Sequence, residues 1–90
     1  MMGKLQEMKQ KAEEVKVKLE STLIQSDGAG GDVKIVITGS RRIQSIELAD
    51  SLQHGDKQAL EEQLVVALNR AIEKADRMNE EEMKKAAGGL

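Results

Sequence analysis

The last third of the chain carries the pattern of one long, uninterrupted helix, and this helix limits what 90 residues can fold into. Asp56 is a favourable N-cap residue, the pattern runs from about 57 to about 87, and Gly88 and Gly89 end it. At about 1.5 Å per residue the helix is roughly 45 Å long, whereas a compact domain of this size has a radius of gyration of about 12 Å. The helix is therefore predicted to extend beyond its own domain, so that its distal part, about 76–87, protrudes into solvent or meets a partner.

This helix has an apolar side and a charged side. Small alanines beside the large apolar residues let a sheet or another helix approach closely. A basic row lies beside an acidic row; i,i+4 pairing in an exposed helix is one interpretation, and contact with a polyanion is the other. The apolar rows are Leu60, Leu64, Leu68 and Ile72, and Ala67, Ala71 and Ala75; the basic row is Arg70, Lys74, Arg77 and Lys84; the acidic row is Glu73, Asp76 and Glu80.

Residues 2 to about 20 have the pattern of a shorter amphipathic helix. Apolar residues alternate at steps of three and four, as in the a and d seam of a coiled coil, and a lysine occupies each flanking e or g position. Two such helices in parallel would place lysine against lysine, so the seam is predicted to face a sheet or an acidic helix. The lysines are interpreted either as solvated edges of the helix or as phosphate contacts. The seam is Leu5, Met8, Ala12, Val15 and Leu19, and the lysines are Lys4, Lys9, Lys11, Lys16 and Lys18.

Three short strands are predicted between the helices, at about 21–26, 32–38 and 41–49. A glycine-rich cluster at 27–31 predicts the first turn, and Gly39-Ser40 fits a two-residue hairpin turn with glycine first. The strands would form a three-stranded antiparallel meander. The fold class is therefore α+β, with one domain over residues 1–90.

The apolar pattern of the strands predicts which side chains point inward. In the second strand the inward residues are Val33, Ile35 and Ile37, and in the third they are Ile46 and Leu48. Ile43 breaks this alternation and indicates a bulge near Gln44. Val36 and Ile43 are expected on the second face of the sheet, which would then also be partly covered, for example by another subunit.

Composition narrows the class of protein. A domain of this length buries only about 60–65% of the surface of its unfolded chain, and this core contains no Phe, Tyr, Trp or Pro, so a core shared between two subunits is expected. There is no Cys, no apolar segment long enough to span a bilayer and no signal-peptide pattern, which favours a cytoplasmic protein. The net charge of −2 argues against a nucleic-acid partner unless the cations cluster.

No catalytic or metal-binding pattern stands out. His54, the single histidine, is expected in an exposed loop without a second ligand nearby, and a metal site needs three or four ligands. The carboxylates of Glu61-Glu62 and of 80–82 are adjacent on a helix and do not face one another as an acid/base pair would. The glycine cluster leads into a strand rather than a helix with Lys and Ser/Thr, so it is not a P-loop. Neither an enzyme nor a cofactor is expected.

The segments, taken in order, resemble a known family. A glycine-rich turn is followed by 32–39 (DVKIVITG), 43–48 (IQSIEL), the loop 50–52 (DSL) and 60–71 (LEEQLVVALNRA). This order is similar, along nearly the whole chain, to that of the YbaB/EbfC family. Ala49 precedes the loop 50–52 and shifts it by one residue relative to the family pattern. The resemblance implies an α-β-β-β-α protomer, a tweezer-like homodimer with splayed long helices, and DNA binding associated with nucleoid organisation and sometimes with gene regulation.

The expected function is therefore the binding of double-stranded DNA by a homodimer, through phosphate contacts that carry no sequence information. Without aromatic residues the chain cannot stack on the bases of single strands. The rival prediction is a protein–protein adaptor or chaperone-like module, in which Met78 and Met83 grip a partner and the acidic runs repel phosphate. The predicted DNA-binding residues are Lys4, Lys9, Lys11, Lys16, Lys18, Arg41, Arg42, Arg70, Lys74 and Arg77.

Overall fold

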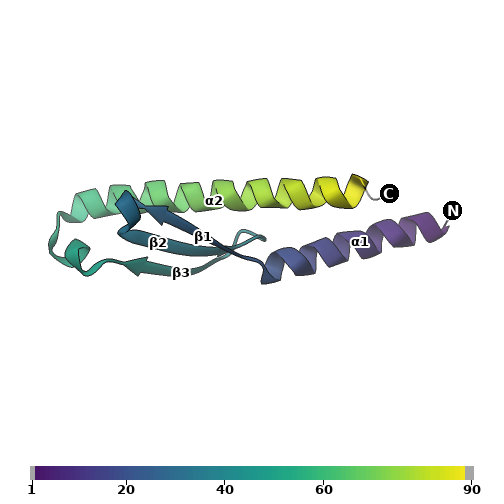
Figure 1. Ribbon diagram of the computed structural model, residues 1–90, viewed down its shortest axis with the longest axis horizontal. Coiled ribbons are helices and arrows are strands. Elements are labelled where there is room, and N and C mark those ends of the chain that lie inside the picture. The colour runs from purple at the N-terminus through teal and green to yellow at the C-terminus, as the bar shows by residue number, and fades with distance from the viewer. Residues whose placement is uncertain (1, 89–90) are drawn as a thin grey trace.

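A computed structural model describes residues 2–88, and its elements follow the predicted order of helix, three strands and long final helix (Figure 1). The α-β-β-β-α order and the α+β class are confirmed. The segment expected to be a loop, from Asp50 to His54, is a short 3-10 helix. The elements are α1 (Met2–Ser21), β1 (Leu23–Gly28), η1 (Ala29–Gly31), β2 (Val33–Thr38), β3 (Ile43–Leu48), η2 (Asp50–His54) and α2 (Lys57–Gly88).

Asp56 caps the start of α2 as its sequence position predicts. Its Oδ1 accepts a hydrogen bond from the backbone N–H of Gln58 at 3.0 Å, and its C=O accepts the first helical bond from Leu60 N–H at 3.0 Å. A side-chain oxygen at this position satisfies one of the N–H groups that a helix leaves without an internal partner. The start of the long helix is thereby fixed at the end of η2.

The strands form an antiparallel sheet in the order β1-β2-β3, which is the predicted meander. On the face toward α2, Val33, Ile35 and Ile37 are completely buried. The helix residues that cover them are the alanine row of α2, which is also completely buried, and the partly buried Leu64 and Leu68 pack beside this contact. The contact is close because both sides are small: a Cβ added to Gly28 of β1 would lie 2.6 Å from the Cβ of Ala67.

The bulge in β3 is confirmed, and its effect differs from the prediction. The register of β2 with β3 shifts between Val36 and Ile37, so that Ile43 pairs with Ile37 and lies on the same face as Ile46. The extra residue restores the alternation that Ile43 breaks in the sequence. The prediction that Ile43 lies on the second face of the sheet is therefore wrong.

The turn between β2 and β3 is longer than the predicted Gly39-Ser40 hairpin. Thr38 N–H donates to the C=O of Arg42 at 2.8 Å, and Arg41 N–H donates to the C=O of Thr38 at 3.0 Å, which leaves three residues in the loop. The residue with positive φ is Arg41, at 68°. Three-residue hairpin loops place a left-handed residue at this point, so the glycine-first, two-residue turn is wrong.

Helix α1 packs on the rest of the chain mainly through its C-terminal half. Val15 and Leu19 are buried. Leu19 lies close to Gly39 in the β2–β3 turn: a Cβ added to Gly39 would lie 2.8 Å from the Cδ2 of Leu19. Leu5 and Met8, from the same predicted seam, are more than half exposed. The seam is therefore covered at one end and open at the other.

The molecule is a rod rather than a globule, with extents of 62 × 16 × 16 Å and a radius of gyration of 17.4 Å. Figure 1 shows that α2 crosses the sheet and then continues beside α1, so that both helices project from the same end of the sheet. This confirms that the last helix outruns the domain. The two projecting segments, residues 2–18 of α1 and 76–88 of α2, are called the arms below.

Candidate nucleic-acid interface

Two of the predicted DNA-binding cations cap the outer edge of β1. The alternation of the β1–β2 ladder aims the carbonyls of Gln25 and Asp27 away from β2. Arg70 Nη1 donates to the C=O of Asp27 at 3.2 Å, and Lys74 Nζ donates to the C=O of Gln25 at 3.4 Å. Side chains from α2 therefore occupy backbone acceptors that an incoming strand would need.

Two more predicted cations form ion pairs with the distal half of α2. Arg41 Nε pairs with Asp76 Oδ1 and joins the β2–β3 turn to the helix. Lys18 Nζ pairs with Glu82 Oε2 at 2.9 Å and joins α1 to α2. The hydrogen bond from Lys18 is the main reason why the pKa of the Glu82 carboxyl lies below its usual value. Both cations thus have partners inside the protein.

The other predicted cations fall into two groups. Lys11 is half-buried and lines a cleft between the arms. The rest are exposed, and within residues 2–88 the structure shows no ion pair for their side chains. They are distributed over the N-terminal arm, the β2–β3 turn and one flank of α2. These exposed cations are Lys4, Lys9, Lys16, Arg42 and Arg77.

The edge of β3 differs from the edge of β1. The ladder aims the N–H and C=O groups of Ile46 and Leu48 away from β2, and among the hydrogen bonds described for residues 2–88 none joins them to another element. Their side chains share the inner face of the sheet, yet they are 45% and 37% exposed because α2 covers β1 and β2 instead. β3 is an open, apolar edge strand.

The side of α2 that looks toward β3 is apolar as well. Ile72 lies one turn before Asp76, the partner of Arg41 in the β2–β3 turn, and Val65 lies two turns before Ile72 on the same side. Val65 is 59% and Ile72 40% exposed. Together with the exposed apolar residues of β3 they make up the set of residues here called the open flank. The open flank consists of Ile43, Ile46, Leu48, Val65 and Ile72.

The match to protein families spans the chain: the model of the YbaB/EbfC DNA-binding family matches residues 1–90. The chain belongs to the YbaB/EbfC family. A nucleoid-associated protein of Flavobacterium johnsoniae is 48% identical over 83 residues, which cover 92% of this chain and 77% of that protein. A nucleoid-associated protein of Chloroflexus aurantiacus is 31% identical over 91 residues, which cover all of this chain and 91% of that protein.

The fold is shared with a solved structure. The crystal structure of an uncharacterised protein from Helicobacter pylori superposes with a TM-score of 0.74 at 27% sequence identity, over 96% of this chain and 98% of that one. The elongated α-β-β-β-α protomer is therefore not peculiar to this chain. The family resemblance predicted from the order of the sequence segments is confirmed.

Sequence reasoning missed two features of this family member. The first is the role of Arg70 and Lys74 at the edge of β1, because a side chain that caps a distant carbonyl leaves no periodic signal. The second is the pairing of Glu82 with Lys18, which lie 64 residues apart. The sequence alone predicts that the acidic run at 80–82 repels phosphate, whereas in the structure Glu82 is held by lysines on both sides.

Two other features are absent from the described part of the chain. Within residues 2–88, no group of three or more His, Cys, Asp or Glu side chains is placed to hold a metal ion. The side chain of His54 lies outside the described residues. Neither of the two α-helices in this range is long and apolar enough to cross a membrane.

Proposed function

We propose that this YbaB/EbfC protein binds double-stranded DNA as a homodimer in the bacterial cytoplasm, within the nucleoid, and that phosphate contacts supply most of the affinity. The observation that supports this most directly is the set of exposed cations for which residues 2–88 supply no ion-pair partner, and these lie mainly on the α1 arm. Arm-like helices of this kind fit along a duplex rather than around a small substrate. A contribution to nucleoid organisation or gene regulation follows from the same binding, and no catalytic step is proposed.

The homodimer is supported by the open flank. Five exposed apolar residues on β3 and α2 adjoin an unpaired strand edge, and such edges are normally covered in a stable protein. A second copy offers the same surface, so an isologous contact would bury both open flanks at once. The arms and the capped β1 edge would then remain on the outside of the dimer, with each cationic set present twice.

Within this dimer the ten predicted cations would not act equally. Lys9 and Lys16 are exposed on the α1 arm, and phosphate contact at these positions breaks no ion pair described for residues 2–88. Arg70 and Lys74 would have to leave the β1 carbonyls before they reach a phosphate. We therefore assign the main contacts to Lys4, Lys9, Lys16, Arg42 and Arg77, with Lys11, Lys18, Arg41, Arg70 and Lys74 in a secondary position.

Titration of a fluorescent duplex with the protein at two salt concentrations tests the proposal. If each dimer contacts six to ten phosphates, the affinity should fall by about 10³- to 10⁵-fold between roughly 50 and 200 mM salt, because binding releases counterions. Lys9→Ala with Lys16→Ala should weaken binding and flatten the salt dependence. The matched control, Gln6→Ala with Gln10→Ala, changes exposed residues of the same arm without changing charge and should bind as the parent does. An affinity that does not vary with salt overturns phosphate contact.

One observation favours the rival function, a protein–protein adaptor. Leu5, Met8 and Met83 are exposed on the arms, where a partner protein could bind them. A pull-down from lysate with and without nuclease separates the two functions, because partners bridged by DNA are lost on nuclease treatment. Partners retained after nuclease, but lost on Met8→Ser with Met83→Ser, would support the adaptor.

A further inference from the structure

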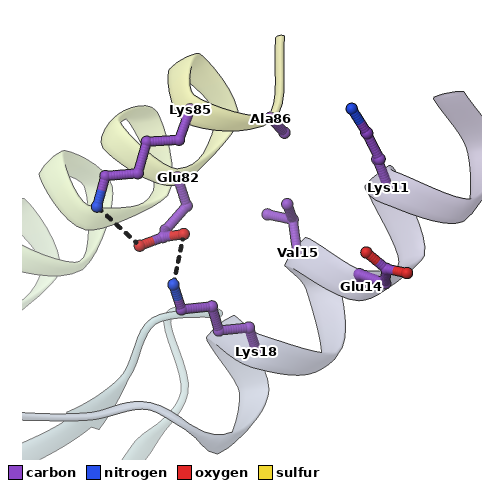
Figure 2. Close-up of a pocket in the computed structure, with 7 residues that line it drawn as sticks. All are labelled: Lys11, Glu14, Val15, Lys18, Glu82, Lys85 and Ala86. Carbon is purple, nitrogen blue, oxygen red and sulfur yellow. Dashed lines mark hydrogen bonds and ion pairs between the residues drawn. The ribbon is translucent and has the colours of Figure 1, made fainter. Parts of the chain in front are cut away.

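A cleft of about 350 Å³ lies between the two arms, lined by α1 and by the last turns of α2 (Figure 2). Val15 of α1 and Ala86 of α2 form its apolar part. The rest of the lining is charged and comes from both helices. These charged residues are Lys11, Glu14, Lys18, Glu82 and Lys85.

An internal carboxylate occupies this cleft. The Glu82 side chain is only 13% exposed, and its carboxylate lies between the ammonium groups of Lys18 and Lys85, as Figure 2 shows. The Nζ of Lys18 is 2.9 Å from Oε2, and the Nζ of Lys85 is 3.7 Å from Oε1. Two cations from two helices thus hold one anion, and lysine ammonium groups make the same kind of charge-assisted hydrogen bond to a phosphate.

The two lysines remain open to a second anion. Their side chains are 59% and 73% exposed, so that solvent reaches both ammonium groups while Glu82 fills the space between them. With Glu82 in place the charged lining sums to +1, from three lysines and two glutamates. Without the Glu82 carboxylate the same lining sums to +2. An entering phosphate would therefore meet a more cationic cleft if Glu82 moved out.

We propose that this cleft is a phosphate-binding site for the DNA backbone, and that in the free protein Glu82 fills it and latches the arms together. A phosphate of the duplex takes the place of the Glu82 carboxylate on Lys18 and Lys85, which breaks the direct link from Glu82 to Lys18, and the arms move apart as far as the bridging phosphate requires. This inference rests on the proposed DNA binding and deepens it. It adds Lys85, which the sequence analysis left out, to the phosphate contacts, and it makes Glu82 an internal competitor of DNA.

The distance between the arms tests the latch without DNA. The chain contains no Cys, so spin labels attach only at introduced cysteines, and Gln6→Cys on α1 with Ala87→Cys on α2 places them at exposed positions. Labelled protein is mixed with an excess of unlabelled protein, so that each assembly carries at most one labelled chain. Pulsed electron resonance then gives the distribution of distances between the two arms of one chain.

Glu82→Gln is compared with Glu81→Gln, which removes the same charge from a neighbouring exposed residue. Glu82→Gln should lengthen and broaden the distance distribution, whereas Glu81→Gln should leave it as in the parent. Addition of a short duplex should shift the parent toward the distribution of Glu82→Gln. Circular dichroism of both variants checks that the helices are intact, so that a broad distribution reports arm separation and not unfolding.

The DNA affinity of the same variants completes the test. Glu81→Gln should tighten binding slightly, through net charge alone. Glu82→Gln should tighten it by a further five- to tenfold or so, which is the size expected of one additional charge-assisted hydrogen bond to a phosphate. Equal affinities and equal distances for the two variants overturn the latch. If the parent fails to bind duplex at low salt, the proposed function fails, while the distances measured without DNA still decide whether Glu82 holds the arms.

Discussion

The two edge strands of the sheet differ in how the rest of the chain covers them. At β1 the helix α2 lies so close that Gly28 leaves no room for a Cβ, and Arg70 and Lys74 cap the outward carbonyls. At β3 the helix is absent, and Ile46 and Leu48 are exposed beside unpaired backbone groups. A single chain thus closes one edge with its own side chains and leaves the other open. In the proposed homodimer this difference indicates where the second copy would bind, and it separates cations that hold the β1 edge from cations that remain exposed for the proposed DNA contacts.

The largest expected effect is at the β3 edge. Ile46→Asp would place a charge in the middle of the proposed dimer contact, where it has no partner and loses its hydration. The dissociation constant of the dimer should rise by at least about 100-fold, or about 2.7 kcal/mol. Sedimentation equilibrium over a range of protein concentrations measures this directly.

Ser45→Asp is the matched control for this substitution. Ser45 is the neighbour of Ile46 on β3 and is also exposed, but it pairs with Val36 on the opposite face of the sheet. The same charge there should leave the dimer intact. If both variants dissociate equally, or if neither the parent nor Ser45→Asp is a dimer, β3 is not the shared edge and the open flank needs another occupant.

The next effect concerns the β1 edge and is a loss of stability within one chain. In Gly28→Ala the added Cβ would lie 2.6 Å from the Cβ of Ala67 and 3.3 Å from its Cα, so the helix has to shift away from the sheet. Overpacking of this kind costs about 1–3 kcal/mol of unfolding free energy, measured by urea denaturation. Gly55→Ala, whose Cβ would meet only a carbonyl at 3.8 Å, should be neutral or slightly stabilising. Equal stabilities would mean that α2 adjusts freely over β1.

Local patterns in the sequence are sufficient for most of the fold. Apolar spacing identifies both helices and the inner face of β2, and Asp56 marks where α2 begins, because these signals arise within a few residues of one another. The prediction of the β2–β3 turn fails because Gly39 suggests a left-handed position that Arg41 occupies instead. Residue 39 has to be glycine because Leu19, 20 positions earlier in the chain, packs against it and leaves no room for a Cβ. Local turn preferences cannot predict such a long-range contact.

The candidate site is less predictable than the fold. The sequence shows the positions of basic residues but not their partners, and the structure engages Lys18, Arg41, Arg70 and Lys74 with atoms far away in the chain. The alanine row of α2 shows the same limit: spacing places it beside the leucine row, while burial shows that it is the centre of the contact. Long-range packing decides which cations remain exposed without a partner, and a short segment of sequence cannot predict that packing.

The smallest effect tests the division between the two kinds of cation. Arg70→Ala with Lys74→Ala removes both donors from the β1 carbonyls and should lower the free energy of unfolding by about 1 kcal/mol, since these are exposed hydrogen bonds. It should also produce assemblies larger than a dimer, because a second strand edge is then open. Arg77→Ala with Lys84→Ala removes the same charge from exposed positions of the same helix and should change stability by less than about 0.5 kcal/mol.

Urea denaturation, light scattering and duplex titration of these two double variants separate the roles. The Arg77 and Lys84 variant should lose DNA affinity and keep its stability and size, whereas the Arg70 and Lys74 variant should lose stability first. If the Arg70 and Lys74 variant instead keeps its stability and dimeric size while its DNA affinity falls as far as that of the other, the capping bonds contribute nothing. The basic row of α2 would then be one continuous phosphate-binding surface, and the contrast between the edges would rest on the apolar residues of β3 alone.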